Sequence, residues 1–244
     1  MNSEMLICAE GVSFAYEKDR PVLRDISFAL REGETVGLIG ENGAGKSTLL
    51  RLLVGLLPSY TGELAVCGLP VRKDHLPEIR RRCGYIFQDS DSQLFMNTVG
   101  EDVGFAPAAY GCGPEEVRER TERALKLVRI PHLQDQSVYR LSGGEKKLVS
   151  IAGVLTMTPE ILIMDEPSAA LDPKNRRNLI RIVKELPFAR LLSSHDLDFI
   201  RDTCSRVLLL HEGRIAADGP AEEILRDREL LEAHGLLLPL SLGG

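Results

Sequence analysis

Residues 40–47 read Gly40-Glu41-Asn42-Gly43-Ala44-Gly45-Lys46-Ser47, which fills every fixed position of the pattern G-x-x-x-x-G-K-S/T. The apolar run at 34–39 before it predicts a short buried strand, and residues 48–54 after it predict a helix. The glycines allow backbone N–H groups to close around a polyphosphate, and the helix adds the positive end of its dipole. The sequence therefore predicts a phosphate-binding loop between a strand and a helix.

Two side chains at the end of this loop extend the prediction. We expect Lys46 to reach the β- and γ-phosphates of a nucleotide, and Ser47 to place its hydroxyl on the Mg²⁺ that neutralises them. The expected phosphate-binding residues are Asn42, Gly43, Ala44, Gly45, Lys46, Ser47 and Thr48. The simpler alternative is a glycine-rich turn that only caps a helix.

Composition limits the kind of protein. Of the 244 residues, 43% are hydrophobic and 27% charged, so we expect a globular chain with material for one large α/β domain or two small ones. A net charge of −6 argues against broad nucleic-acid binding. No apolar run reaches the ~18 residues of a membrane span, so work at a membrane would require a partner's helices. The five scattered cysteines favour reduced thiols over a disulfide framework or a zinc site.

A second motif supplies carboxylates. The apolar residues 161–164 precede Asp165 and Glu166, which predicts a buried strand that delivers both carboxylates to its C-terminal end. Asp165 is expected to assist Ser47 at the Mg²⁺, because this ion prefers oxygen ligands such as carboxylates. Glu166 is then placed to orient or deprotonate water. The alternative is a buried strand that merely ends in charged residues.

Three further candidates are weak when taken alone. Tyr16 ends a strand-like run and could stack on a nucleotide base, or simply pack on a sheet. Gln88 follows a buried strand predicted at 84–87. His195 follows a short apolar run, and it and its neighbours could be ordinary helix-capping residues.

Ser142-Gly143-Gly144-Glu145 opens another predicted helix. Free N–H groups and the helix dipole at that end suit a phosphate. Ser142 with Glu145 also fits a capping box, in which the two residues satisfy each other's backbone N–H groups. Both interpretations can hold, because a cap and a phosphate-facing N-terminus use the same end of the helix.

The chain changes character between residues 89 and 155, where glycine and proline punctuate helical segments near 97–110 and 115–130. We interpret 89–155 as a helical subdomain inserted into an α/β core made of about 1–88 and 156–225. Strand-like runs at 6–14 and 22–30 flank a polar turn. A single helix is expected at 220–231. Residues 226–244 form a C-terminal tail, in which 236–240 are apolar enough to dock on another surface.

With the phosphate loop, the Ser142 motif, Asp165-Glu166 and His195 in this order, residues 5–225 resemble the nucleotide-binding domain of ABC transporters. The resemblance implies an α/β fold: a P-loop NTPase (ABC ATPase) core with an antiparallel β subdomain and an inserted α-helical subdomain. It also implies an ATP hydrolase with ATP and Mg²⁺ as cofactors, in which Tyr16 stacks on adenine and Gln88 senses Mg²⁺ and the membrane partner. The implied Mg²⁺ residues are Ser47, Gln88 and Asp165, and the implied catalytic residues are Lys46, Glu166 and His195.

The resemblance further implies partners. Two cassettes of this family sandwich two ATP molecules, so the expected partner is a second copy of the chain or a homologous ATPase, with Ser142 and Gly144 facing the opposite subunit's nucleotide. Transmembrane coupling and substrate-binding subunits are also implied, with the chain peripheral on the cytoplasmic face of the cell membrane. The family usually has glutamine at Glu145. Because a triphosphate repels a carboxylate, we expect Glu145 to point away from ATP.

Finer features are similar to energy-coupling factor importers, particularly those for cobalt and nickel. They lie at 87–95, 99–103, 146–153, 193–197, 230–236 and 238–240. A vitamin importer's shared ATPase, a soluble ABC ATPase and a nucleotide-binding regulatory subunit without turnover remain alternatives. The transported substrate stays open, because the residues that touch it lie on other chains, and so does the choice between a homodimer and a heterodimer.

Overall fold

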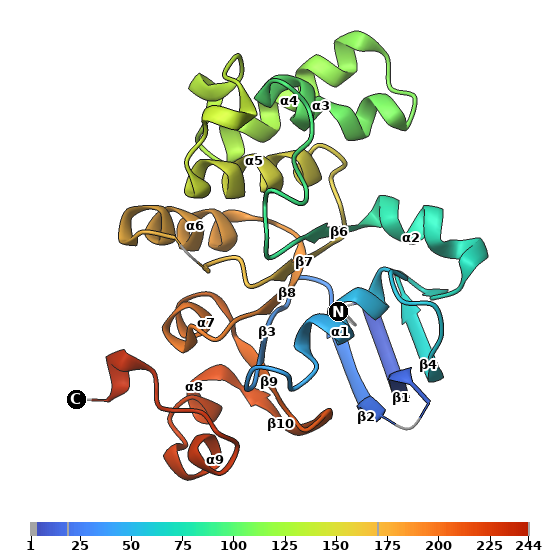
Figure 1. The fold of residues 1–244 in the computed structure, drawn as a ribbon, viewed down its shortest axis with the longest axis vertical. Coiled ribbons are helices and arrows are strands. Elements are labelled where there is room, and N and C mark those ends of the chain that lie inside the picture. The colour runs from blue at the N-terminus through green and yellow to red at the C-terminus, as the bar shows by residue number, and fades with distance from the viewer. Residues whose placement is uncertain (1–3, 19, 170, 244) are drawn as a thin grey trace.

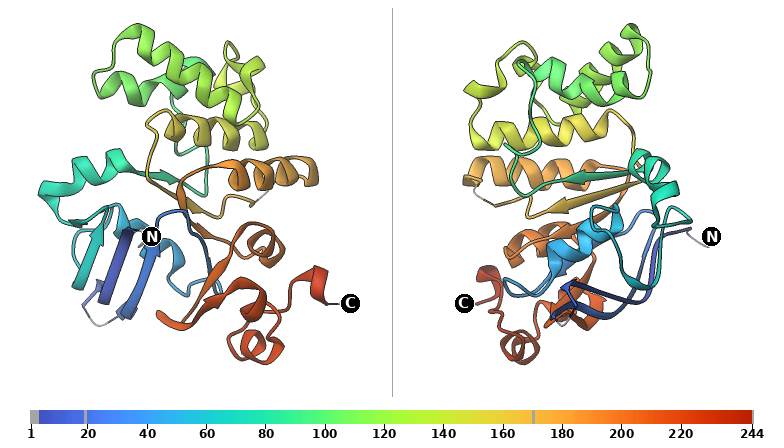
Figure 2. Two further views of the ribbon diagram at one scale, coloured as in Figure 1. Left: turned by 180° about the vertical axis from the view of Figure 1, so that it is seen from behind. Right: turned by 45° about the vertical axis from the view of Figure 1, so that its right-hand side comes forward.

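A computed structural model describes residues 4–18, 20–169 and 171–243. Within these residues the strands form a six-stranded sheet and a four-stranded sheet. Figure 1 shows three layers of structure: a group of helices on one side, the large sheet in the middle, and the small sheet on the other side. Figure 2 shows the same arrangement from behind and obliquely.

The large sheet carries the phosphate loop. Its order is β10-β9-β3-β8-β7-β6. The strands are β3 (Thr35–Ile39), β6 (Cys83–Ile86), β7 (Ile161–Asp165), β8 (Ala189–Ser193), β9 (Arg206–His211) and β10 (Arg214–Pro220). All pairs are parallel except β9 with β10. Every residue of β3, β7 and β8 is buried, as is typical of parallel strands that are covered on both faces.

The small sheet is antiparallel where β1 meets its neighbours. Its order is β2-β1-β4-β5, made of β1 (Met5–Glu17), β2 (Arg20–Arg31), β4 (Thr61–Val66) and β5 (Leu69–Pro70). The strand runs predicted at 6–14 and 22–30 lie inside β1 and β2. Helix α1 (Lys46–Leu53) follows the phosphate loop, and its apolar side chains share one core cluster with both sheets. This packing fixes the start of α1 near the carboxyl end of β3, inside the large sheet.

Helices α3 (Val99–Ala109), α4 (Pro114–Leu127) and α5 (Gly143–Leu155) lie together at the top of Figure 1. The helices expected near 97–110 and 115–130 are α3 and α4, within a few residues. Thr98 begins α3 with a capping box, and Ser142 begins α5 in the same way. Apolar residues of this group, such as Val103 and Ile151, join the core cluster that covers one face of the large sheet.

The remaining helices are α2 (Leu76–Arg82), α6 (Pro173–Glu185), α7 (Leu197–Thr203), α8 (Ala221–Ile224) and α9 (Arg228–Ala233). The single helix expected at 220–231 was wrong, since α8 and α9 are separate. Asp227 accepts a hydrogen bond from the backbone N–H of Leu230 and so caps a new helix. The tail docks on α7, where the Asp198 carboxylate accepts from the backbone N–H groups of Leu240 and Ser241.

Two expectations from composition can be compared with this fold. Across the described residues, no helix is both long enough and apolar enough to cross a membrane. The cysteines, Cys8, Cys67, Cys83, Cys112 and Cys204, all lie in this part of the chain and are free thiols.

Candidate functional site

The phosphate loop wraps the start of α1. Gly43 and Gly45 adopt positive φ values of 85° and 108°, which glycine tolerates without strain. At Gly40 a Cβ atom would lie 2.1 Å from the carbonyl oxygen of Leu210, so a larger residue does not fit. The Ala44 side chain is buried in the core, and its backbone N–H donates to the carbonyl of Glu41 at 3.2 Å.

Lys46 lies inside this loop. Its side chain is buried, and Nζ donates to the carbonyl oxygens of Gly40 at 2.6 Å and Glu41 at 3.1 Å. Burial lowers the pKa of Lys46, while the carboxylates of Glu166 and Asp165 act in the opposite direction. The site thus combines a buried ammonium group, which attracts phosphate oxygens, with two acidic residues, which attract a cation such as Mg²⁺.

Asp165 links side chains at the carboxyl ends of several strands of the large sheet. Its Oδ1 accepts from the hydroxyls of Ser47 at 3.0 Å and Ser193 at 2.7 Å, and its Oδ2 accepts from the Tyr85 hydroxyl at 3.3 Å. Burial, followed by the Asp165 charge, raises the pKa of Tyr85. Ser47 and Asp165 therefore meet, as a shared Mg²⁺ site requires.

Sequence reasoning missed Ser193 and Tyr85 as site residues. Ser193 is fully buried and pairs in register with Asp165 across the parallel strands β8 and β7. The available signal was the repeated form of the two segments, each an apolar run that ends in polar residues. Nothing in the order of residues marked Tyr85, which lies on β6 beside β7.

Glu166 and His195 contact each other directly. Glu166 has a positive φ of 47°, and its backbone N–H donates to the carbonyl of Ser193 at 3.2 Å and lies 3.1 Å from the Ser193 hydroxyl. Its Oε2 accepts from the His195 backbone N–H at 3.2 Å and lies 2.7 Å from His195 Nδ1. The Glu166 side chain is 8% exposed and that of His195 is 63% exposed. A buried carboxylate is thus held at the wall of the site by an accessible imidazole.

One polar pocket of about 390 Å³ collects most of the predicted residues. Its lining is Val22, Asn42, Gly43, Gly45, Lys46, Ser47, Thr48, Gln88, Glu166 and His195. Tyr16 is half exposed, and its hydroxyl lies 3.3 Å from the Thr48 hydroxyl. The Tyr16 ring packs edge-on against Phe14, with centroids 4.8 Å apart. Val22, which sequence reasoning did not select, adds an apolar side chain to the pocket wall.

The start of α5 shows the reciprocal hydrogen bonds of a capping box. Glu145 Oε2 accepts from the backbone N–H of Ser142 at 2.8 Å and from its hydroxyl at 2.7 Å, and the Glu145 N–H lies 3.4 Å from that hydroxyl. These bonds lower the pKa of Glu145. At Gly144 a Cβ atom would lie 2.4 Å from the Asn175 side chain, so glycine allows α6 to approach. The capping-box interpretation is confirmed, and the contact of Ser142 and Gly144 with a nucleotide stays a prediction.

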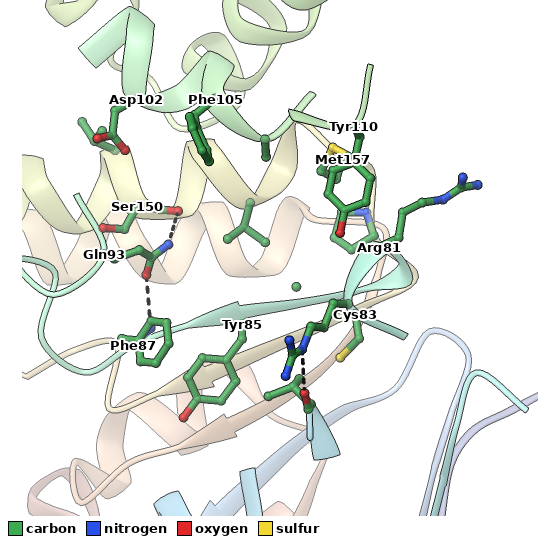
Figure 3. Close-up of a pocket in the computed structure, with 18 of the residues that line it drawn as sticks. Arg81, Cys83, Tyr85, Phe87, Gln93, Asp102, Phe105, Tyr110, Ser150 and Met157 are labelled. Atoms are coloured by element: carbon green, nitrogen blue, oxygen red, sulfur yellow. Dashed lines mark hydrogen bonds between the residues drawn. The ribbon is translucent and has the colours of Figure 1, made fainter. Parts of the chain in front are cut away.

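A second, mostly apolar cavity of about 290 Å³ lies between β6, α3 and α5 (Figure 3). Aromatic side chains line it from both sides: Tyr85, Phe87, Phe95, Phe105 and Tyr110. Phe95, Phe105 and Tyr110 are 57%, 42% and 50% exposed. The Asp102 carboxylate accepts from the backbone N–H groups of Phe95 and Met96 at 2.8 Å each, which fixes the segment that presents Phe95. This cavity is an accessible apolar groove beside the loop that carries Gln88.

Comparison with known proteins agrees with these observations. A family model described as ABC transporter matches residues 23–169. A putative ABC transporter ATP-binding protein of Gloeobacter violaceus is 49% identical over 240 residues, which cover 97% of this chain and 98% of the relative. The energy-coupling factor transporter ATP-binding protein EcfA of Methanothermobacter thermautotrophicus is 42% identical over 239 residues, which cover 96% of this chain and 77% of the relative.

Solved structures show the same fold. The structure of cbiO1 from Clostridium perfringens, described as part of the ABC transporter complex cbiONQ, has a TM-score of 0.85 and 33% identity and covers 94% of each chain. The ATP-binding cassette MJ0796, solved as a dimer in a post-hydrolysis state with ADP and Pi, has a TM-score of 0.79 and 25% identity, covering 88% of this chain and 98% of that one. The predicted α/β fold is confirmed.

Proposed function

The chain belongs to the ATP-binding proteins of ABC transporters, and on that premise we propose that it powers an energy-coupling factor importer for cobalt or nickel ions. Proteins of this class hydrolyse ATP and couple the reaction to transport. ATP hydrolysis is therefore part of the function, which excludes a regulatory subunit that only binds nucleotide. The observation that carries the energy-coupling factor class is the 42% identity to EcfA over 96% of this chain, and the likeness to cbiO1 over 94% of each chain agrees with it.

The polar pocket fits a nucleotide with Mg²⁺. The loop amides and Lys46 would hold the phosphates, and Ser47, Asp165 and Gln88 would hold the ion. Among the described residues, no group of three or more His, Cys, Asp or Glu side chains is arranged to bind a metal by itself. Bound Mg²⁺ usually takes only one or two protein carboxylates, with phosphates and water as its other ligands. When bound, the ion neutralises charge on the phosphates.

Three side chains then divide the chemistry. Glu166 is positioned to orient or deprotonate the attacking water, because its carboxylate lies at the pocket wall. Lys46 stabilises charge on the γ-phosphate, because its buried ammonium keeps one N–H donor beyond the two that the carbonyls of Gly40 and Glu41 accept. His195 is exposed and already contacts Glu166, so it can hold the γ-phosphate next to that carboxylate. Tyr16 supports the base from beside Thr48.

The proposed assembly needs a second ATPase, which is another copy of this chain or a homologue. Ser142 and Gly144 open α5, a helix of thirteen residues whose N-terminal N–H groups suit an anion. The related cassette MJ0796 was solved as a dimer. Two copies closing on two nucleotides would give ATP a higher affinity for the closed state, which is the difference that drives a conformational change.

Membrane subunits are the second kind of partner, and the apolar groove supports this. A helix from a transmembrane subunit, with apolar residues on one face, would fill a groove lined by Phe87, Phe95, Phe105 and Tyr110. The groove adjoins the segment that carries Gln88, so a docked helix would touch residues next to the nucleotide pocket. The proposed docking would make the chain a peripheral protein on the cytoplasmic face of the cell membrane, where ATP is available.

The test is metal uptake. Cells that express the chain with the membrane proteins encoded beside it are assayed for cobalt and nickel, using Glu166→Gln as the inactive control. Uptake that depends on Glu166 supports the proposal and names the ion. Unchanged metal in both strains, together with ATP hydrolysis by the purified chain, would contradict the metal substrate and leave the vitamin importer as the next candidate.

A further inference from the structure

A buried lysine joins α5 to the loop that follows β6. Lys147 lies in the second turn of α5 and is 3% exposed. Its Nζ donates to the carbonyl oxygens of Phe87 at 2.9 Å and Gln88 at 2.7 Å. Within residues 4–18, 20–169 and 171–243, no carboxylate forms an ion pair with Lys147, so the two carbonyls are its partners.

The same loop is attached to α5 at a second, half-buried point. The Gln93 side chain accepts from the backbone N–H of Phe87 at 3.2 Å and donates to the carbonyl of Ser150 at 3.1 Å, as Figure 3 shows. Lys146 adds an ion pair with Asp91 nearer the surface. Residues 87–93 are thus bound along the first turns of α5, and Lys147 holds the end of the loop nearest the nucleotide pocket.

The two ends of this connection lead to two different sites. Gln88 lines the polar pocket together with Ser47 and Glu166. Ser142 caps α5 only five positions before Lys147. A buried ammonium group that loses its hydrogen-bond acceptors is costly. A shift of the loop therefore has to carry Lys147, and with it the start of α5.

We propose that Lys147 is a positioning residue that makes the Gln88 loop and the N-terminus of α5 move as one unit. Nucleotide in one copy's pocket would then set the orientation in which Ser142 and Gly144 meet the nucleotide of the second copy. Lysine suits this task because its compact ammonium can serve two carbonyls, whereas an apolar side chain would leave both unsatisfied. The inference rests on the proposed function, specifically on Gln88 at the pocket and on the pairing of two copies.

The experiment separates nucleotide binding from pairing. The full chain carrying Glu166→Gln, so that ATP persists, is compared with the same chain carrying also Lys147→Met, Lys147→Gln or Lys147→Arg. ATP affinity with Mg²⁺ is measured by equilibrium binding, and ATP-dependent dimer formation by sedimentation. Lys126→Met is the matched control, because Lys126 is an exposed lysine on α4.

We expect all variants to bind ATP within about twofold of the parent. Lys147→Met and Lys147→Gln should weaken ATP-dependent pairing by about tenfold or more, because each variant removes the charged donor that both carbonyls share. Lys147→Arg should restore most of the pairing, and Lys126→Met should leave it unchanged.

The results that would overturn the role of Lys147 differ from the result that would overturn the proposed function. Normal pairing in the folded Met or Gln variant overturns the role of Lys147 and leaves the proposed function intact. Equal losses of ATP binding and pairing also overturn it, because the lysine would then only maintain the pocket. Failure of ATP to pair the Glu166→Gln parent would overturn the proposed two-copy function, and this inference with it.

Discussion

The imidazole Nδ1 of His195 lies 2.7 Å from Oε2 of Glu166, and the backbone N–H of His195 donates to the same oxygen. The two predicted catalytic side chains are therefore partners of each other before any phosphate enters. The contact uses only one ring nitrogen, so an incoming γ-phosphate can meet the other, Nε2, while Nδ1 stays on Glu166. Glu166 Oε1 then remains available to accept a proton from water.

Replacing Glu166 with glutamine should preserve ATP binding and abolish turnover. The amide keeps the size of the side chain and an oxygen that can accept from His195, but it cannot act as a base. We expect phosphate release to fall by about 100-fold or more, while the Kd for ATP changes by less than about threefold. Steady-state hydrolysis at the normal rate would remove Glu166 from the mechanism.

Ser193→Ala should raise the Mg²⁺ concentration that ATP hydrolysis requires. The Ser193 hydroxyl donates to Asp165 Oδ1 at 2.7 Å and lies 3.1 Å from the Glu166 backbone N–H, so it fixes both acidic residues. Loss of such an outer partner typically costs about tenfold or more in metal affinity or activity, so the Mg²⁺ concentration for half-maximal hydrolysis should rise by about tenfold. Mg²⁺ titration of ATP hydrolysis measures this shift.

Ser194→Ala is the matched control for that experiment. Ser194 is the next residue and is also fully buried, but its hydroxyl contacts Ser168 and the Asp196 backbone instead of Asp165. It should lower the free energy of unfolding by about 1 kcal/mol and leave the Mg²⁺ requirement unchanged. Equal shifts in both variants would mean that either change merely loosens the site.

Local sequence was enough to predict the elements that end at the site. The glycine spacing at 40–45 and the apolar run before Asp165 each encode their own structure, because backbone freedom and burial are local requirements. The contacts between side chains on neighbouring strands could not be predicted from local sequence. Ser193 and Tyr85 reach Asp165 only through the order β8-β7-β6, which no single segment contains.

The helix at 220–231 and the burial of Lys147 show a second limit of prediction from the sequence. The helix predicted at 220–231 was wrong because Asp227 is compatible with either a helix interior or a cap, and its bond to Leu230 decides the matter. Lys147 was not singled out, since a lysine in a charged helix start normally faces water. Only the packing of α5 against the end of β6 buries it.

The stability of the chain should depend on pH through Lys147. Burial lowers the pKa of Lys147 to about 8, although Asp89 and Asp165 act to raise it. In the unfolded chain its pKa is near 10.5, so between these values the unfolded state binds more protons and this group makes stability rise with pH. Below pH 8 the ammonium is charged in both states, and the cost of burying it is present in full.

Urea unfolding of the native chain and Lys147→Met at several pH values tests this. Subtracting the two free energies of unfolding removes the other titrating groups. The native chain should gain about 2 kcal/mol relative to the variant between pH 7.5 and 9.5. A constant difference across this range would show that the lysine keeps an ordinary pKa in the folded protein.

Phe95→Ala in the apolar groove should reduce transport more than basal hydrolysis, and a smaller side chain at Leu94 should act in the same direction. Phe95 is 57% exposed and packs mainly edge-on against Phe105, so its removal costs the fold little. An aromatic anchor in a filled groove contributes about 2 kcal/mol or more to binding, so transport should fall by more than about tenfold.

Both rates are measured in one reconstituted preparation, with Tyr139→Ala as the control because Tyr139 is an exposed aromatic outside the groove lining. Parallel loss of hydrolysis and transport would instead indicate a folding defect, and the groove would lose its proposed role as the docking site of the membrane subunit.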